Sequence, residues 1–322
     1  MNIRDRHGLK SAAADALSCA PNHQKLVLIW AAANAALPLL ASILNFILNS
    51  QIAETGGLSG IGLRSVLSTA QSFLSTATSL LIPFWTLGYT ATALRFSRRE
   101  SANFNTLLEG FRRFGPALRL MLLEALLFTL VCIACFYAGI TVLSMTPLAE
   151  PVWEVLEQGQ DMLLSGVIDE SILATVSEAM MPMFWICCGL CLLVFTPILY
   201  HLRLAEYCLL DAPHRSAILA MRESRRLMHR NRLQLLKLDL SFWWFYLAQL
   251  ALTAVCYGDS ILPMLGIELP FSKDAAYFIF YMISLVAQLA LMYCCSNRIQ
   301  TTYALFYDIL REPPKEEQAI II

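Results

Sequence analysis

Charged side chains are scarce in this chain of 322 residues, where Asp, Glu, Lys and Arg together make up 15%. Hydrophobic residues make up 57%, and the mean hydropathy is +0.59. This composition excludes an ordinary soluble domain and indicates an integral membrane protein. Basic and acidic residues nearly balance, at 23 and 24, so there is no electrostatic case for a nucleic-acid partner.

The chain also lacks the short motifs that mark common enzyme chemistries. It contains no Walker-type Gly-Lys-Ser/Thr loop, no His-Glu-x-x-His, no Gly-x-Ser-x-Gly and no dinucleotide-binding fingerprint. These absences argue against ATP hydrolysis and peptidase chemistry on this chain. We therefore expect a protein that is not an enzyme and that has no cofactor.

Long apolar segments dominate what is present, and each is long enough to cross a bilayer as a helix. The first of them exceeds the apolar core of a cleavable signal peptide, so we expect an uncleaved span. The sequence predicts an all-α fold, a polytopic transmembrane helix bundle of about six spans with amphipathic helices at the cytoplasmic interface. The predicted spans lie at about 26–49, 66–94, 120–143, 183–204, 235–257 and 275–295.

Basic residues gather in alternate connecting segments. Every Lys and Arg except Arg64 and Lys273 lies in or beside the N-terminal segment, the segments after the second and fourth spans, or the C-terminal part. The positive-inside rule then places both termini in the cytoplasm. The predicted parts are a cytoplasmic segment at 1–25, a membrane domain at 26–310 with basic inner segments at 95–119 and 205–234 and an acidic outer loop at 145–180, and a cytoplasmic tail at 311–322.

Residues 211–232 predict a basic helix at the membrane surface. Asp211 is a residue type that caps helix N-termini, and Pro213 is tolerated in a first turn. Apolar residues such as Ile218 fall near one face and arginines near the other. Such a helix can lie against anionic headgroups or dock a partner such as a cytoplasmic ATPase. The candidates for lipid or partner contact are Arg112, Arg113, Arg215, Arg222, Arg225, Arg226 and Arg230.

Four ionisable residues are predicted at a similar depth near the cytoplasmic mouth of the bundle: Glu124, His201, Arg203 and Asp239. Charges in the hydrocarbon are costly, so such residues are functional candidates. One interpretation is a proton or cation relay, or a vestibule for an anionic substrate. The other is interfacial pairing, in which the two acids meet Arg203, Arg119 or Lys237.

Cysteines form two i, i+3 pairs inside apolar segments, Cys132 with Cys135 and Cys188 with Cys191, with Cys187 beside the second. Two such pairs bind zinc in a suitable loop, but no Gly or polar turn opens these helices. Cysteines inside apolar runs also do not resemble a disulfide framework. We therefore expect these cysteines to be small buried hydrophobic residues, with no metal.

Hydroxyl residues repeat along the predicted second span. Ser68, Ser72, Ser75 and Ser79 fall on one helix face, and Pro83 followed by Gly88 predicts a kink. Small residues of this kind let helices pack closely, and they can also line a water-filled path.

Four stretches carry a family resemblance. Residues 207–216 contain a Tyr and an Asp-x-Pro turn, residues 224–232 a Ser-x-x-Leu-Met basic helix, residues 240–244 a Leu-Ser-Phe span start, and residues 301–307 a Phe-Tyr pair. They resemble an uncharacterised bacterial multi-pass integral-membrane family, domain of unknown function 975. The matching residues are Ser224, Leu227, Met228, Leu240, Ser241, Phe242, Phe306 and Tyr307.

The resemblance covers about residues 83–310 and implies a multi-pass protein of the bacterial cytoplasmic (inner) membrane, with no catalytic residues to carry over. Two places depart from the family pattern. Trp243 and Trp244 come early, and residues 294–297 stand where a Pro-Tyr pair is expected.

Two functional hypotheses follow. The first is a scaffold or accessory subunit of a membrane complex, whose basic helices contact anionic inner-leaflet lipids and another membrane subunit or a cytoplasmic ATPase. The alternative is a permease-like component that moves a small or amphipathic solute through a bundle of the first, second and fourth spans.

Overall fold

The computed structural model describes residues 5–54, 58–146, 150, 152–153, 170–212, 216–258, 261–262 and 273–311, and all regular secondary structure in them is α-helical. The predicted all-α class is confirmed. Four helical stretches are long and apolar enough to cross a membrane, and a bent helix pair makes a fifth if it counts as one span. A sixth span stays a prediction.

The candidate spans correspond closely to the apolar segments. They are His23–Leu44 in α2 (His23–Glu54), Phe114–Ser144 (α6), Met183–Asp211 in α8 (Glu170–Leu202) and α9 (Ala205–Asp211), and Ala276–Arg311 in α14 (Lys273–Arg311). The bent pair is α11 (Arg232–Leu240) with α12 (Trp243–Cys256). Most of the acidic loop at 145–180 and the tail after Arg311 lie outside the described residues.

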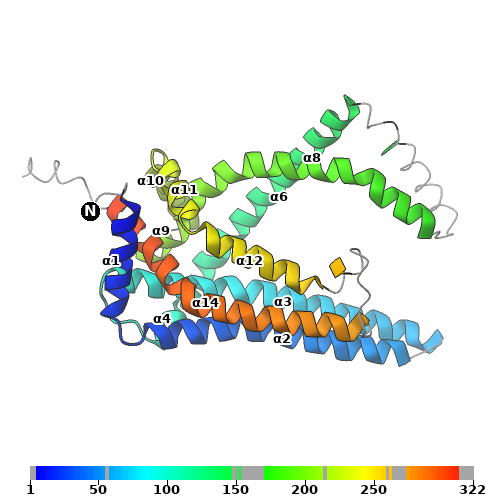
Figure 1. Ribbon diagram of the computed structural model, residues 1–322, viewed down its shortest axis with the longest axis horizontal. Coiled ribbons are helices and arrows are strands. Elements are labelled where there is room, and N and C mark those ends of the chain that lie inside the picture. Colours follow the sequence, from blue (N-terminus) through cyan, green and yellow to red (C-terminus); the bar gives the residue numbers. More distant parts are fainter. Residues whose placement is uncertain are drawn as a thin grey trace, which may run out of the picture. The chain divides into compact units, whose positions relative to one another are not determined.

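The chain divides into two compact units, one formed by Met1–Leu118 with Leu204–Ile322 and the other by Arg119–Arg203. In the first unit, α2, α3 (Leu58–Ser97) and α14 run side by side, and α12 packs on α14 (Figure 1). The short helix α1 (Arg6–Ser18) crosses the end of α14, and Asp5 caps its N-terminus by accepting from the amide of Gly8 at 3.0 Å. Trp30 stacks on Tyr89 at 4.1 Å where α2 meets α3.

The second unit contains α6 from Arg119 onward and α8. Phe128 and Phe195 meet edge to face at 4.8 Å, and the sulfurs of Cys132 and Cys191 are 3.9 Å apart. One cysteine of each predicted pair, Cys132 and Cys191, therefore meets the other across these helices, and both are free thiols.

Helix α3 is the predicted span that is not among the candidates, because its many hydroxyl residues lower its hydropathy. Those hydroxyls bond back to the carbonyls one turn earlier: Ser72 donates to Ser68 at 2.9 Å, and Thr76 donates to Ser72 at 2.8 Å. Ser79 does the same to Ser75 at 2.8 Å. The hydroxyl groups are thus satisfied within the helix itself.

The predicted start of the basic helix is wrong. Asp211 is the last residue of α9, and Ser216 caps α10 (Ala217–Met228) by accepting from the amide of Leu219. The side chain of Asp211 is used elsewhere, in ion pairs with α3 and α14. Pro213 lies outside the described residues.

The predicted fifth span is not one straight helix. Helices α11 and α12 meet at an angle of 63° around Ser241 and Phe242. Lys10 donates from Nζ to the carbonyl of Ser241 at 2.8 Å and lies 4.0 Å from the centre of the Phe242 ring. The bend is therefore held by α1, and burial together with the charges of Arg298 and Arg6 lowers the pKa of Lys10.

Helix α3 ends in a turn in which Arg99 adopts an unusual backbone conformation. The amide of Glu100 donates to the carbonyl of Arg95 at 2.9 Å, and the amide of Arg99 donates to the carbonyl of Phe96 at 3.0 Å. This Schellman arrangement places one residue in the left-handed region, where glycine is preferred. That residue is Arg99, with φ = 58°.

We therefore expect Arg99→Gly to raise the free energy of unfolding by about 0.5–1 kcal/mol, because glycine relieves the left-handed strain but gains freedom in the unfolded chain. Thermal unfolding in detergent measures it. Arg99→Ala is the matched control, since it removes the same charge but keeps a Cβ atom. An equal gain in both variants would assign the effect to the charge and not to the backbone.

Candidate functional site

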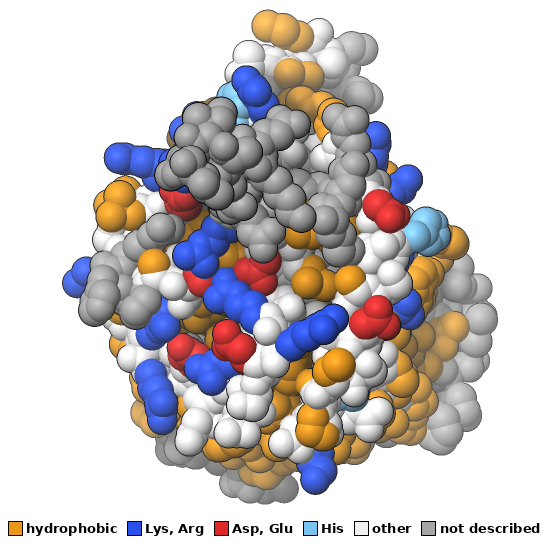
Figure 2. Space-filling model, turned by 90° about the vertical axis from the view of Figure 1, so that its left-hand side faces the viewer, with side chains coloured by type: hydrophobic (Ala, Val, Ile, Leu, Met, Phe, Trp, Pro, Cys, Tyr) orange, Lys and Arg blue, Asp and Glu red, His pale blue; other side chains and the backbone are white. Residues whose placement is uncertain are grey.

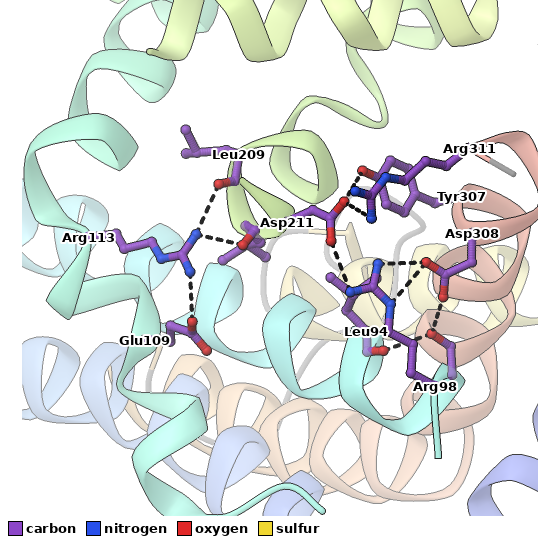
Figure 3. Close-up of polar contacts among 11 residues, drawn as sticks. Leu94, Arg98, Glu109, Arg113, Leu209, Asp211, Tyr307, Asp308 and Arg311 are labelled. Carbon is purple, nitrogen blue, oxygen red and sulfur yellow. Dashed lines mark hydrogen bonds and ion pairs between the residues drawn. The ribbon is translucent and has the colours of Figure 1, made fainter. Parts of the chain in front are cut away.

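A cluster of ion pairs joins the ends of three helices in the first unit. Arg98 follows the end of α3, Asp211 closes α9, and Asp308 and Arg311 lie in the last turn of α14 (Figure 3). Arg98 contacts Asp211 at 2.9 Å and Asp308 at 2.8 Å, and Arg311 also pairs with Asp211. We call Arg98, Asp211, Asp308 and Arg311 the ion-pair cluster.

Asp211 is the centre of this cluster. Its side chain is only 7% exposed, whereas those of Arg98 and Arg311 are 30% and 53% exposed. The hydroxyl of Tyr307 donates to Asp211 at 3.1 Å, and the Tyr307 ring stacks on Tyr207 at 5.6 Å. A nearly buried carboxylate with two cations and one hydroxyl is well compensated.

Arg98 is the cation that bridges the two acids. Burial disfavours its charge, but hydrogen bonds and charges from Asp308 and Asp211 outweigh burial, so the pKa of Arg98 lies above its ordinary value. The hydroxyl of Ser97 donates to Asp308 at 2.7 Å and fixes the carboxylate from the other side. Arg98 therefore stays protonated as the bridge between the two acids.

The side chain of Arg113 points into the first unit and is only 20% exposed. Its guanidinium donates to the carbonyls of Leu209 and Leu210 at 3.0 and 2.6 Å, and it pairs with Glu109 at 3.0 Å (Figure 3). These carbonyls lie in the last turn of α9, where helical partners are missing. Arg113 thus caps the helix that presents Asp211.

The other arginines predicted to contact lipid or a partner lie outward. Arg112, Arg222, Arg225 and Arg230 are exposed, and Arg226 is 77% exposed while it pairs with Glu223 at 2.6 Å. The end of the molecule seen in Figure 2 gathers many Lys, Arg, Asp and Glu side chains among hydrophobic ones. Arg215 lies outside the described residues.

Helix α10 divides these side chains by face. Ala217, Ala220, Ser224 and Met228 are buried, and the Ser224 hydroxyl accepts from the amide of Leu204 at 3.2 Å. Ile218, which the sequence placed on the apolar face, is instead 60% exposed. Only small residues and Met228 pack inward, because α10 lies directly on α9.

The four intramembrane candidates divide between the units. Glu124 on α6, His201 on α8 and Arg203 belong to the second unit, and Asp239 on α11 belongs to the first. Asp239 accepts a hydrogen bond from Tyr303 of α14, whose hydroxyl is 2.8 Å from that of Tyr246. A single cluster of the four stays a prediction.

The sequence pointed to Asp211 and Tyr307 but not to their roles, and Arg98, Asp308 and Arg311 were not singled out. Their signal was weak: Arg98 stands just after a predicted span end, where charges are common, and Asp308 and Arg311 lie in the segment after the last predicted span. Within the described parts of the chain, no group of three or more His, Cys, Asp or Glu side chains is arranged to hold a metal ion.

The described residues form helices only, and four or five of these helices are apolar enough to cross a membrane, which is the character of a multi-helix membrane protein. The chain belongs to the family of proteins of unknown function DUF975, whose model matches residues 3–313. The resemblance seen in the sequence is confirmed, and the match begins well before residue 83. Searches of curated proteins and of solved structures returned no match.

Proposed function

We propose that this chain is a six-span protein of the bacterial inner membrane that acts as a scaffold or accessory subunit, with α10 as its contact surface for anionic lipid headgroups. Both termini then lie in the cytoplasm. The alternate placement of basic residues along the sequence supports this orientation.

The observation that carries the proposal is the outward face of α10. Arg222, Arg225 and Arg226 are exposed there together with Ile218 and Leu219. Cations beside exposed apolar side chains suit the headgroup region, where the cations meet phosphate and the apolar groups meet the upper acyl chains. Each Arg near an anionic leaflet contributes about 1 kcal/mol.

The internal hydrogen bonds of α3 support a sixth span. Serine and threonine hydroxyls that bond to their own helix do not themselves need water. Packing of α3 along α2 and α14 covers it with two helices that are themselves candidate spans. Hydropathy alone therefore understates how well α3 suits a bilayer.

A triple variant in which Arg222, Arg225 and Arg226 are each changed to Gln is expected to have a weaker preference for phosphatidylglycerol over phosphatidylethanolamine. The preference should fall by one to two orders of magnitude, because each charge contributes about 1 kcal/mol. Native mass spectrometry of lipids retained from mixed nanodiscs measures this. Glu223→Gln is the control of opposite sign, because it frees Arg226 and should strengthen the preference. Unchanged lipid retention in both variants would contradict the proposal.

The same variants test the role as a subunit. A membrane subunit or a cytoplasmic ATPase that uses α10 should co-purify with the wild-type chain and with Glu223→Gln, and should be lost from the triple variant. A permease-like component is the second candidate function. The observation that favours it is a cavity of about 250 Å³ among α2, α12 and α14.

A further inference from the structure

The cavity lies among α2, α12 and α14, between two candidate spans and the bent pair. Residues Asn34, Ala35 and Pro38 form its wall on α2, and Tyr281, Ser284 and Gln288 form its polar wall on α14. Spacings of three, four and seven residues put the α14 set on one helix face, and Asn34 and Pro38 are four residues apart on one face of α2. The permease alternative placed a path among the first, second and fourth predicted spans, whereas this cavity lies among the first, fifth and sixth.

Polar groups on this wall lack partners that a membrane helix needs. Pro38 has no backbone N–H, so the carbonyl of Asn34 does not receive its usual helical hydrogen bond. The hydroxyl of Tyr281 is buried and has no hydrogen-bond partner within the described residues. Water is absent from a bilayer core, so such groups are tolerated where they face protein or an occupied cavity.

The other polar side chains are partly engaged and fix the shape of the wall. Asn34 donates from Nδ2 to the carbonyl of Trp30 at 2.9 Å, which leaves its side-chain oxygen as an acceptor. Ser284 donates to the carbonyl of Leu252 at 3.1 Å and holds α14 on α12. Tyr281 stacks on Tyr277 at 6.1 Å. Gln288 is exposed and offers both a donor and an acceptor.

Among the residues that the structure describes, none that lines the cavity is charged, and Leu285, Leu289 and Met292 make the rest of the α14 wall apolar. A charged ligand would lose its hydration without a counter-charge, so the chemistry selects a neutral one. The volume corresponds to about eight liquid water molecules, which is below the roughly 300 Å³ at which pockets for drug-sized ligands begin.

We propose that this cavity is a binding site for a small neutral molecule that has both an apolar part and hydrogen-bonding groups. The side-chain amide of Gln288 and the backbone carbonyl of Asn34 bind the polar end of this molecule. The Tyr281 hydroxyl also binds it once the Tyr281 side chain turns toward the cavity. Leucines and Met292 cover the apolar end. This site is independent of the basic face of α10.

Cys256 lines the cavity and reports on its occupation. Maleimide is a suitable probe because it is small and neutral, has an N–H and two carbonyls, and alkylates thiols. The full-length chain in nanodiscs is treated with increasing maleimide, and labelling of each cysteine is quantified by mass spectrometry of peptides. Labelling at Cys256 is expected to saturate, because reversible binding precedes reaction. Cys19, just after α1, is exposed and lies outside the candidate spans, so it should label in proportion to concentration.

Gln288→Leu is expected to raise the half-saturating concentration at Cys256 about three- to tenfold, the usual effect of one lost hydrogen bond. Tyr281→Phe should act in the same direction, and Ala35→Leu, which fills the cavity, should abolish saturation. An unchanged temperature of thermal unfolding shows that a variant is folded, and an unchanged rate at Cys19 shows that the reagent acts equally on it. Linear labelling at Cys256, or saturation that none of these variants alters, would overturn the proposal.

The neutral character of the ligand is tested with two thiosulfonates of the same reactivity. Neutral methyl methanethiosulfonate should label Cys256 at least tenfold faster than anionic sulfonatoethyl methanethiosulfonate, relative to the same ratio at the exposed Cys19. Cys19 is the reference, and not the exposed Cys294, because Cys294 lies within a candidate span. Equal ratios would mean that ions enter freely and that no neutral-selective site exists. The triple Arg variant of α10 should leave all these rates unchanged, which separates this result from the proposed lipid contact.

Discussion

Gly88→Ala is expected to leave little folded protein in the membrane. A Cβ atom at Gly88 of α3 would overlap the carbonyl oxygen of Leu107 and lie 2.6 Å from its carbonyl carbon. These are backbone atoms of α4 (Phe104–Leu107), so no side chain can swing away to make room. The helices must separate, which places the loss at or above the upper end of the roughly 1–3 kcal/mol typical of overpacking.

The contact is reciprocal, which makes it harder to relax. A Cβ atom at Gly110 of α5 (Glu109–Arg112) would overlap the carbonyl oxygen of Phe84 and lie 3.1 Å from the amide nitrogen of Gly88. The Phe84 ring stacks on Phe114 at 4.7 Å, so a shift of α3 also disturbs this pair. Gly110→Ala should therefore behave like Gly88→Ala. Natural proteins have only about 5–15 kcal/mol of stability to lose.

Gly189→Ala is the matched control, because nothing lies within 4 Å of a Cβ atom at that position. Gly189 is helical, so alanine there should be neutral or stabilising by up to about 1 kcal/mol. The yield of detergent-solubilised monodisperse protein and its thermal unfolding give the comparison. If Gly88→Ala unfolded at the same temperature as Gly189→Ala, the close approach of α3 and α4 would not exist.

The helices with long apolar runs were predictable from sequence, because crossing a bilayer requires about 20 apolar residues whatever surrounds them. The segments at 26–49 and 275–295 lie within α2 and α14 for this reason. Gly88 was interpreted as part of a kink. Its role in packing against Leu107 depends on a contact between helices, which local sequence does not encode.

The bend between α11 and α12 shows the same limit. The stretch from Leu240 to Phe242 carried the family resemblance, but as the start of a span rather than a bend. The group that holds it, Lys10, is 231 residues away from Ser241. A carbonyl freed at a helix break needs a donor, and only the folded chain shows which one supplies it.

The role predicted for Asp211 was wrong because its contacts with residues far away in the sequence outweigh its local capping preference. An Asp two residues before a Pro is a good helix cap, and the sequence alone favours that role. Two cations and a tyrosine hydroxyl stabilise the Asp211 carboxylate more than one backbone amide would, because hydrogen bonds between two charged groups are stronger than those with one neutral partner. Arg98 and Arg311 approach it from helices that are far apart in the sequence.

Asp211→Asn is accordingly expected to lower the free energy of unfolding of the first unit by about 2–3 kcal/mol. The change keeps the side-chain shape and an acceptor for Tyr307, but it leaves Arg98 and Arg311 without their shared counter-charge. Breaking a buried ion pair costs about 3–5 kcal/mol. Solvent reaches both arginines, which are 30% and 53% exposed, so the expected loss lies below that range.

Asp308→Asn is the matched comparison, since Asp308 shares Arg98 but is 21% exposed and pairs with one arginine in this cluster. It should cost about 1 kcal/mol. A double-mutant cycle with Arg98→Gln separates the two pairs, and a larger coupling energy is expected with Asp211 than with Asp308. Equal losses for the two Asp variants would mean that burial at Asp211 adds nothing. Losses near zero in both variants would mean that α3, α9 and α14 are joined at this end by apolar packing alone.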